Sequence, residues 1–472
     1  MAMQRSSAPS VGIDPAAVTA FADAVDAAGL GVHGLVIARF GRVAAEAWWH
    51  PYAPDEPHMM FSVSKAFTSM AVGLAIAEGA LGLDEPTHAV FPEHPEVPGQ
   101  TIRHLLTMTT GHDRDSFALM RPMPDRDWVR VFFELAAPYP PGEHFVYDTG
   151  ASYVLGAAVS RRTGLSLTDF LQPRLFEPLG WPRPHWERDP RGQEHAGTGL
   201  KLTTRQLAEF GQLLLQRGRW EGRQLVPADY VEAASAHQTR NPWFASHESR
   251  IGYGFQLWRS THGFRADGMW GQFAAVIPEL QLVVATTSGS FDANRILETA
   301  WRHLLPGVDP AFAPPTGHPD GAVFTPGGRR VPDPVFDEAD ASREAALSGI
   351  RFRLQGNRLG VDELTVEFAP DQVALVLSGS GIVAERLVAG RGGWVPGRTA
   401  LWPEEQLPEV PYAAWAGWTG GALEVHQQLT GTPLRRIWRL EPDSAEGARL
   451  IVTFLPDAGP EAAEDLLLTA RQ

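Results

Sequence analysis

Residues 61–69 read FSVSKAFTS, and this stretch carries one of only two lysines, Lys65 and Lys201, in a chain of 472 residues. Lysine and arginine together number 40, so arginine has taken almost every basic position. Arginine stays protonated at any working pH, whereas a desolvated lysine can lose its proton and act as a base. Lys65 is therefore a candidate base for one of two neighbouring serines, Ser62 or Ser64.

The segment from residue 62 to residue 78 has the periodicity of an α-helix. Apolar residues recur at the spacing of one helical face and a glycine follows as a stop signal: Val63, Phe67, Met70, Leu74 and Gly79. On this helix Ser62 lies three residues before Lys65 on the same face, whereas Ser64 points about 100° away. The spacing selects Ser62, at a helix N-terminus whose free N–H groups favour negative charge.

The same helix has a polar stripe that contains Ser62, Lys65 and Ser69. One interpretation is that this stripe faces a site while the apolar stripe faces the core. The simpler interpretation is that Ser62 only caps the helix and Lys65 is a solvated surface charge. The segment alone leaves both interpretations open.

Two later segments carry further candidate groups. FVYDTGASYVLG (145–156) places Tyr147 on an extended segment before a predicted helix, with Thr149 as the expected N-cap. A tyrosine phenol near an ammonium can exist partly as phenolate and relay protons. In RADGMWGQFAAVIPELQLVV (265–284), a glycine-rich turn runs into a strand, so a backbone amide there could form an oxyanion hole with the amide of Ser62.

The first 306 residues predict one mixed domain whose sheet is completed by strands from both of its ends. The alternation of apolar residues predicts strands, the 3.6-residue period predicts helices, and glycines mark several helix ends. The expected strands are a hairpin over 34–49, a strand over 252–260 and two strands over 273–289, and further helices are expected over 150–164 and 203–218.

Residues 307–334 are dense in proline and glycine without periodicity, which indicates a linker. Beyond it, ELTVEFAPDQVALVLSG (363–379) alternates apolar and polar residues on both sides of an APDQ turn, as a β-hairpin does. We therefore expect residues 335–472 to form a small antiparallel barrel or sandwich.

Composition excludes several classes of function. The net charge of −15 repels phosphate backbones, so nucleic acid is not an expected partner. The absence of cysteine removes disulfides, thiolate metal sites and cysteine nucleophiles, and no metal or other cofactor is expected. No signal peptide and no apolar stretch of about 18 residues is visible, so we expect a soluble cytoplasmic protein that does not bind membranes. The oligomeric state stays open.

Taken together and in this order, the three elements resemble the serine β-lactamase and penicillin-binding-protein superfamily. The resemblance is to its class C-like branch of esterases, D-aminopeptidases and aminohexanoate-oligomer hydrolases, and it covers about residues 15 to 305. It implies an α+β domain, with an antiparallel sheet flanked by helices and an all-helical lobe. The C-terminal β domain is similar to the lipocalin-type module appended to some of these hydrolases.

The resemblance also implies roles for individual residues. Ser62 is the acylated nucleophile, Lys65 the neighbouring general base and Tyr147 the proton relay. The oxyanion hole uses the backbone amides of Ser62 and Met269. The matched motifs add five residues expected to contact or position the substrate: Asp148, Thr149, Asp267, Gly268 and Gln272, the last with a packing role as its alternative. Two more candidates come from the residues themselves and not from the resemblance: His112 near the mouth of the site and Trp270 in an acyl pocket, each with a structural role as its alternative.

Two motifs depart from the family pattern. Y-x-N is here Tyr147-Asp148-Thr149, which replaces an amide by a shorter hydroxyl. K-T-G has become A-D-G at 266–268, so the cation that would meet a substrate carboxylate is missing and Asp267 would repel it. We therefore expect weak hydrolysis of β-lactams.

The expected function is a serine hydrolase that cleaves a small ester or amide through an acyl-enzyme on Ser62. One alternative is an acyltransferase or peptide cyclase, since an amine can replace water in the second step, and the C-terminal domain could decide between the two. Another alternative is a non-catalytic ligand-binding relative, since the second and third motifs are altered.

Overall fold

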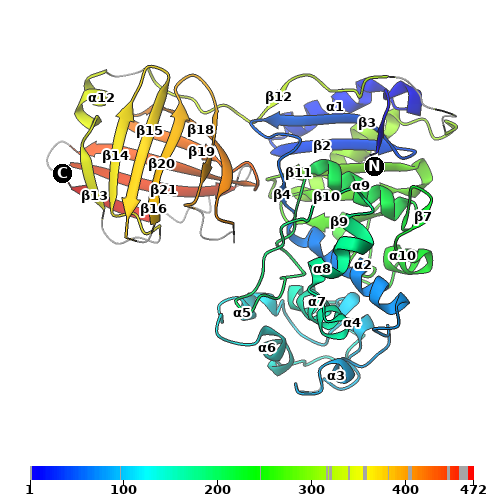
Figure 1. Cartoon of the computed structure of the whole chain (residues 1–472). Coiled ribbons are helices and arrows are strands. Elements are labelled where there is room, and N and C mark those ends of the chain that lie inside the picture. Colours follow the sequence, from blue (N-terminus) through cyan, green and yellow to red (C-terminus); the bar gives the residue numbers. More distant parts are fainter. Residues whose placement is uncertain are drawn as a thin grey trace.

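The computed structural model describes residues 3–471 apart from residues 96, 245, 315–316, 318–320, 339–340, 355–358, 381, 402–406, 444–446 and 457–465. Its described strands form two large sheets, one from the first two thirds of the chain and one from the last third (Figure 1). The first sheet is packed with helices and the second curls on itself. This arrangement confirms the predicted fold class.

The first sheet runs in the order β1-β3-β2-β11-β10-β9-β8. Its strands are β1 (Gln4–Arg5), β2 (Val32–Arg39), β3 (Arg42–His50), β8 (Trp258–Arg259), β9 (Phe264–Gly268), β10 (Gln272–Ile277) and β11 (Leu282–Ser288). The predicted hairpins are β2–β3 and β10–β11, and β2 lies antiparallel beside β11. The two ends of this domain therefore complete one sheet, as expected.

Helices cover both faces of this sheet. The burial of strand β2 shows why both faces must be covered. All eight residues of β2 are buried. Leu35 and Ile37 pack in a cluster with α1 (Pro15–Ala27) and α11 (Ala293–Thr299), whereas Val36 and Ala38 pack in a second cluster on the other face. A strand without a polar face fits only a sheet that is covered on both sides.

The second cluster joins the sheet to a helical lobe. The helices between β3 and β8 are α2 (Ser64–Ala77), α3 (Thr87–Val90), α4 (Ile102–Leu106), α5 (Phe117–Met120), α6 (Trp128–Glu134), α7 (Thr149–Thr163), α8 (Leu167–Leu171), α9 (Thr204–Leu215) and α10 (Ala228–Ser235). Helix α7 ends at Gly164, whose φ of 73° is the left-handed conformation that a C-terminal glycine allows. Helix α9 begins with a capping box between Thr203 and Gln206.

The segment predicted to be a linker lies along the edge of the first sheet. Strand β12 (Arg329–Arg330) pairs in parallel with β3 at Trp49 and His50, and Phe324 forms a further bridge with Ala45. Two short ladders lie outside the sheet: β4 (His58–Met59) with β5 (Lys201–Leu202), and β6 (Arg219–Trp220) with β7 (Arg223–Gln224).

The second sheet is antiparallel apart from one bridge and runs β16-β15-β14-β13-β22-β21-β20-β19-β18-β17. Its bounds, with the helix that precedes it, are α12 (Ala341–Leu347), β13 (Arg351–Leu354), β14 (Glu363–Phe368), β15 (Gln372–Gly379), β16 (Ile382–Gly390), β17 (Val395–Thr399), β18 (Val410–Thr419), β19 (Ala422–Gln428), β20 (Leu434–Asp443), β21 (Gly447–Pro456) and β22 (Leu466–Arg471). The predicted hairpin is β14–β15, with Leu364 opposite Leu377. A bridge between Gly390 and Trp415 brings β16 to β18, so the sheet curls into a barrel.

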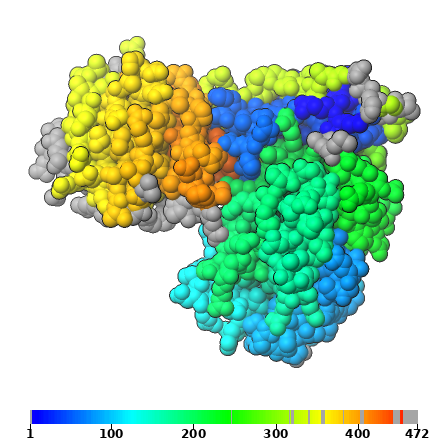
Figure 2. Space-filling view, in the orientation of Figure 1, coloured from blue at the N-terminus to red at the C-terminus, as the bar shows by residue number. Residues whose placement is uncertain are grey.

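The barrel lies directly against the first domain. In Figure 2 the orange part of the barrel meets the blue and green surface of the first domain without a gap in that view. One part of the contact is the turn between β19 and β20, residues 429–433, which packs on β4. Within the described ranges no helix is both long and apolar enough to cross a membrane.

Candidate active site

Ser62 lies in a 3-10 turn, Phe61–Val63, that leads directly into α2. The α-helix therefore starts two residues later than its apolar period suggests, and Phe61 at the start of the turn has a φ of 45°. Non-glycine residues rarely adopt this conformation, and such strain gathers at functional sites. The result is that Ser62 and Lys65 lie one turn apart at the start of the helix.

Lys65 is bonded to the serine that the spacing selects. Its Nζ donates to Ser62 Oγ at 2.9 Å, and its side chain is 1% exposed. Ser64 points elsewhere, since its hydroxyl donates to the Phe61 carbonyl at 2.6 Å and accepts from the Leu200 amide at 3.2 Å. The alternative of a solvated surface lysine is therefore wrong.

The polar stripe that was expected to face the site is only partly used. Ser69 is fully buried, and its hydroxyl lies 3.1 Å from the Tyr230 hydroxyl. Helix α2 is buried around its whole circumference, because α7, α8 and α10 also pack against it. Only the first turn of the polar stripe reaches the pocket.

Burial controls the charge of Lys65. Desolvation lowers the pKa of its ammonium to about 8, although the carboxylates of Asp115, Asp148 and Asp267 act in the opposite direction. Nζ also donates to Thr149 Oγ1 at 3.2 Å and to the Gly197 carbonyl at 2.8 Å. A substantial fraction of Lys65 is thus neutral at mildly alkaline pH and able to accept a proton.

Tyr147 completes the contacts of the serine hydroxyl. Its phenol is hydrogen-bonded to Ser62, its ring stacks on Trp258 at 5.4 Å, and Lys65 Nζ lies 4.8 Å from the ring centroid. Burial raises the pKa of the Tyr147 phenol, while the hydrogen bond to Ser62 lowers it. The phenol stays protonated at neutral pH, so the partial phenolate expected from the sequence is not favoured here.

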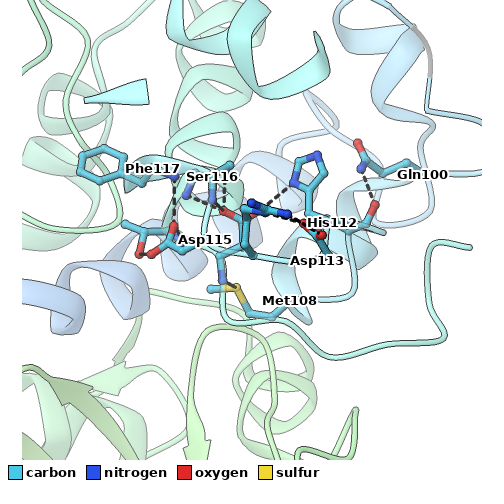
Figure 3. A network of polar contacts seen from close by, with 12 residues as sticks. Gln100, Met108, His112, Asp113, Asp115, Ser116 and Phe117 are labelled. Carbon is cyan, nitrogen blue, oxygen red and sulfur yellow. Dashed lines mark hydrogen bonds and ion pairs between the residues drawn. The ribbon is translucent and has the colours of Figure 1, made fainter. Parts of the chain in front are cut away.

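Asp115 and Asp148 stand behind Lys65 in a network of polar contacts. Asp115 accepts from the Thr149 hydroxyl and the Thr149 amide, each at 2.9 Å. Asp148, not Thr149, caps α7: its carboxylate accepts from the Gly150 amide at 3.0 Å and lies 2.8 Å from His112 Nδ1. Figure 3 shows Asp115, Ser116 and His112 close together in this network.

The glycine-rich turn after β9 comes to lie beside Ser62. A Cβ on Gly268 would lie 2.3 Å from the Met60 carbonyl oxygen, so only glycine allows this approach. Gln272 holds the turn, because its amide donates to the Met269 carbonyl at 2.8 Å and to the Ser288 carbonyl at 2.9 Å. Burial and these bonds give Gln272 the packing role.

Asp267 is not a free negative charge. Its carboxylate accepts from Arg265 Nε at 2.7 Å, and Arg265 is fully buried. Burial raises the pKa of the Asp267 carboxyl, while the charge of Arg265 lowers it. The repulsion of a substrate carboxylate that the sequence suggests is therefore weakened by this ion pair.

A pocket of about 400 Å³ opens over the nucleophile. Four of the predicted residues line it: Ser62, Thr149, Met269 and Trp270. Five others are not among its lining residues: His112, Asp148 and Gln272 are buried, and Asp267 and Gly268 lie on β9. Across the described ranges, no group of three or more histidine and carboxylate side chains is arranged to hold a metal ion.

Sequence reasoning missed three parts of this site. Asp115 lines the pocket and lies 34 positions before Thr149, and Gly197 offers only a backbone carbonyl. Thr432 and Leu434, from the barrel, also line the pocket. The Phe117 amide, at the start of α5, donates to the Asp115 carboxylate at 3.0 Å. The position of an aspartate just before a helix was therefore the one sequence signal for Asp115.

The electrostatic interaction of Asp115 with Lys65 predicts a change in pH dependence. In Asp115→Asn the carboxylate that raises the pKa of Lys65 is lost. We therefore expect the ascending limb of kcat/KM against pH, expected near pH 8 in the wild type, to move to a lower pH. The measurement is hydrolysis of a p-nitrophenyl ester between pH 6 and 10. Asp113→Asn is the matched control, because Asp113 is paired with Arg114 at 2.7 Å outside the pocket. A limb that stays in place in Asp115→Asn contradicts the electrostatic role.

Comparison with known proteins agrees with this geometry. The chain is 27% identical over 225 residues to a 6-aminohexanoate-dimer hydrolase of Paenarthrobacter ureafaciens, which is 43% of this chain and 57% of that protein. It is 31% identical over 170 residues to esterase EstB of Burkholderia gladioli, which is 31% of this chain and 43% of the esterase. The chain thus spans about half the length of these relatives.

Solved structures show the same fold. A penicillin-binding protein homologue from Caulobacter crescentus matches with a TM-score of 0.50 at 21% identity, over 61% of this chain and 97% of that one. SurE, solved with D-Leu, matches with a TM-score of 0.51 at 20% identity, over 88% of this chain and 98% of that one. The Beta-lactamase family matches residues 18–308. Since this match covers more than half of the chain, the protein belongs to the beta-lactamase family.

Proposed function

We propose that the protein is a serine hydrolase that cleaves a small ester or amide through an acyl-enzyme on Ser62. The observation that carries this proposal is the pair of contacts on one hydroxyl. Ser62 Oγ is bonded to Lys65 Nζ at 2.9 Å, with the lysine buried, and to the Tyr147 phenol. Covalent acyl transfer requires a nucleophile that is hydrogen-bonded to a base, and Lys65, whose pKa is lowered, can serve as that base for Ser62.

The first half of the reaction forms the acyl-enzyme. Neutral Lys65 takes the proton of the Ser62 hydroxyl, directly or through Tyr147, as Oγ attacks the carbonyl carbon. The carbonyl oxygen becomes an oxyanion that the amides of Ser62 and Met269 can stabilise. When the bond from carbon to the leaving oxygen or nitrogen breaks, Tyr147 and Lys65 return the proton to the leaving group.

The second half releases the product. Water loses a proton to the same pair and adds to the acyl carbon, and the bond between that carbon and Ser62 Oγ then breaks. The proton returns to Ser62 and the free acid leaves. Thr149 supports both halves, because its hydroxyl links Lys65 Nζ to the Asp115 carboxylate.

Three observations support a small ester or amide as the substrate. The position of the family's K-T-G lysine is occupied by Ala266, so the cation that meets a β-lactam carboxylate is missing there. Asp267 beside it is committed to Arg265. Two similar proteins are named as a hydrolase of the 6-aminohexanoate dimer and as an esterase.

A fluorophosphonate probe tests the nucleophile. We expect one adduct, located by mass spectrometry on Ser62, that disappears in Ser62→Ala and persists in Ser64→Ala, because Ser64 is bonded to backbone groups and points away from the pocket. With p-nitrophenyl acetate, Ser62→Ala should lose at least about 10³-fold in kcat/KM. Absence of the adduct in the wild type would support the non-catalytic ligand-binding alternative instead.

A further inference from the structure

The pocket over Ser62 is closed on one side by the C-terminal barrel. Thr432, from the turn between β19 and β20, and Leu434, the first residue of β20, line the same pocket as Ser62, Met59 and Phe61. These two residues follow the nucleophile by about 370 positions in the chain. The catalytic domain alone does not provide this part of the pocket lining.

The turn is fixed to the segment that leads into the nucleophile. The Met59 amide, three residues before Ser62, donates to the Gly431 carbonyl at 2.9 Å. A Cβ on Gly431 would lie 3.1 Å from the Pro57 carbonyl oxygen, so the two backbones are in close contact. A shift of the turn would therefore act directly on the chain that leads into Ser62.

A second attachment is made by Tyr52, which is buried at the same contact. Its hydroxyl accepts from Gln428 Nε2 at 2.6 Å and donates to the Thr432 carbonyl at 3.3 Å. The Tyr52 ring stacks on His33 at 3.7 Å, and His33 Nδ1 lies 3.1 Å from His58 Nε2. Tyr52, Gln428 and Thr432 are each at most 6% exposed, so the turn is held in place and not merely resting on a surface.

The position of Tyr147 indicates which part of a substrate meets this wall. In the proposed function Tyr147 gives its proton to the leaving group, so the leaving group departs on the side of Tyr147 and Trp258. Tyr147 is not one of the described residues that line the pocket, whereas Thr149 and Met269 are. We take the pocket that Leu434 and Thr432 line as the acyl side of Ser62.

We propose that the β19–β20 turn of the barrel forms the end wall of the acyl pocket and that Leu434, with Thr432, limits the length of the acyl group. This inference rests on the proposed function, since it assumes that Ser62 is acylated. The physical basis is steric. The pocket of about 400 Å³ is lined by Asp115, Arg121, Glu187 and His195 as well as by Leu434. A methylene that reaches Leu434 must either fit against its side chain or stay in water.

The test is a series of p-nitrophenyl esters from acetate to octanoate. In Leu434→Ala the wall moves back by the volume of the removed methyl groups, so the ratio of kcat/KM for octanoate to that for butyrate should rise about tenfold. Tyr52→Phe removes the hydroxyl that holds the turn and should move the same ratio in the same direction by a smaller factor. Thermal unfolding of each variant shows whether the barrel remains folded.

Leu407→Ala is the matched control. Leu407 and Leu434 are both partly buried against the same barrel core, but Leu407 lines a different cavity between the domains. We expect the acyl profile of Leu407→Ala to equal that of the wild type. The proposal is overturned if Leu434→Ala leaves the dependence of kcat/KM on acyl length unchanged, or if Leu407→Ala shifts it equally. If Ser62 takes no fluorophosphonate in any variant, the proposed function fails first and the inference fails with it.

Discussion

Replacing Lys65 by methionine lowers kcat/KM for a p-nitrophenyl ester by about 10²- to 10⁴-fold. Methionine has nearly the length of lysine and fits an apolar environment, so the buried helix keeps its packing while Ser62 loses its base. The ascending limb near pH 8 should disappear as well, since the group that titrates there is gone. Steady-state kinetics between pH 6 and 10, with circular dichroism to confirm folding, measure both effects.

The other lysine of the chain is the control for this experiment. Lys201 lies in β5 and is 5% exposed, so Lys201→Met also places a methionine at a buried lysine. Lys201 lies opposite Met59 and beside Gly431, not against the Ser62 hydroxyl, so we expect Lys201→Met to keep the ascending limb of the pH profile that Lys65→Met loses. If both variants lose activity equally, the loss comes from removing a buried positive charge and not from the loss of proton transfer at Ser62.

Gly268→Ala should lower kcat by about 10²- to 10³-fold, the usual loss when one oxyanion-hole donor is misplaced. The added Cβ would lie 2.3 Å from the Met60 carbonyl oxygen, so the turn after β9 must move away from the start of α2. The amide of Met269 then no longer points to the same place as the amide of Ser62. Single-turnover kinetics with p-nitrophenyl acetate separate this loss from any change in binding.

Gly328→Ala controls for the intrinsic effect of replacing a glycine. A Cβ on Gly328 meets no described atom within 4 Å, and the residue belongs to the segment between the domains. Its activity should equal that of the wild type. Normal turnover in Gly268→Ala would show that the Met269 amide does not stabilise the oxyanion.

Local patterns in the sequence predicted local structure well. The hairpin β14–β15 pairs Leu364 with Leu377, only 13 positions apart, so alternation around one turn was enough. The segment from 307 to 334 was different, because Arg329 pairs with Trp49 and nothing in either stretch reveals the other. Pairing across 280 positions depends on how the whole sheet assembles.

The residues of the candidate site also fall into those predictable from local spacing and those placed by tertiary packing. Ser62 and Lys65 are one helical turn apart, so their spacing was sufficient to predict the contact. The cap of α7 was placed one residue too late, since Asp148 and Thr149 are both good cap residues and only the fold shows which one turns back to the helix. Asp115 and Leu434 reach the pocket through tertiary packing, which leaves no periodic signal.

The attachment of the barrel turn at β4 has a consequence for the ancestry of such chains. A hydrolase that lost its barrel would lose the Met59–Gly431 and Tyr52–Gln428 hydrogen bonds three to ten residues from its nucleophile. Each of these hydrogen bonds contributes about 0.5–1.5 kcal/mol to stability. Truncation of the barrel therefore removes support from the segment that leads into Ser62, and an exchanged barrel has to reproduce the contacts with Tyr52 and β4.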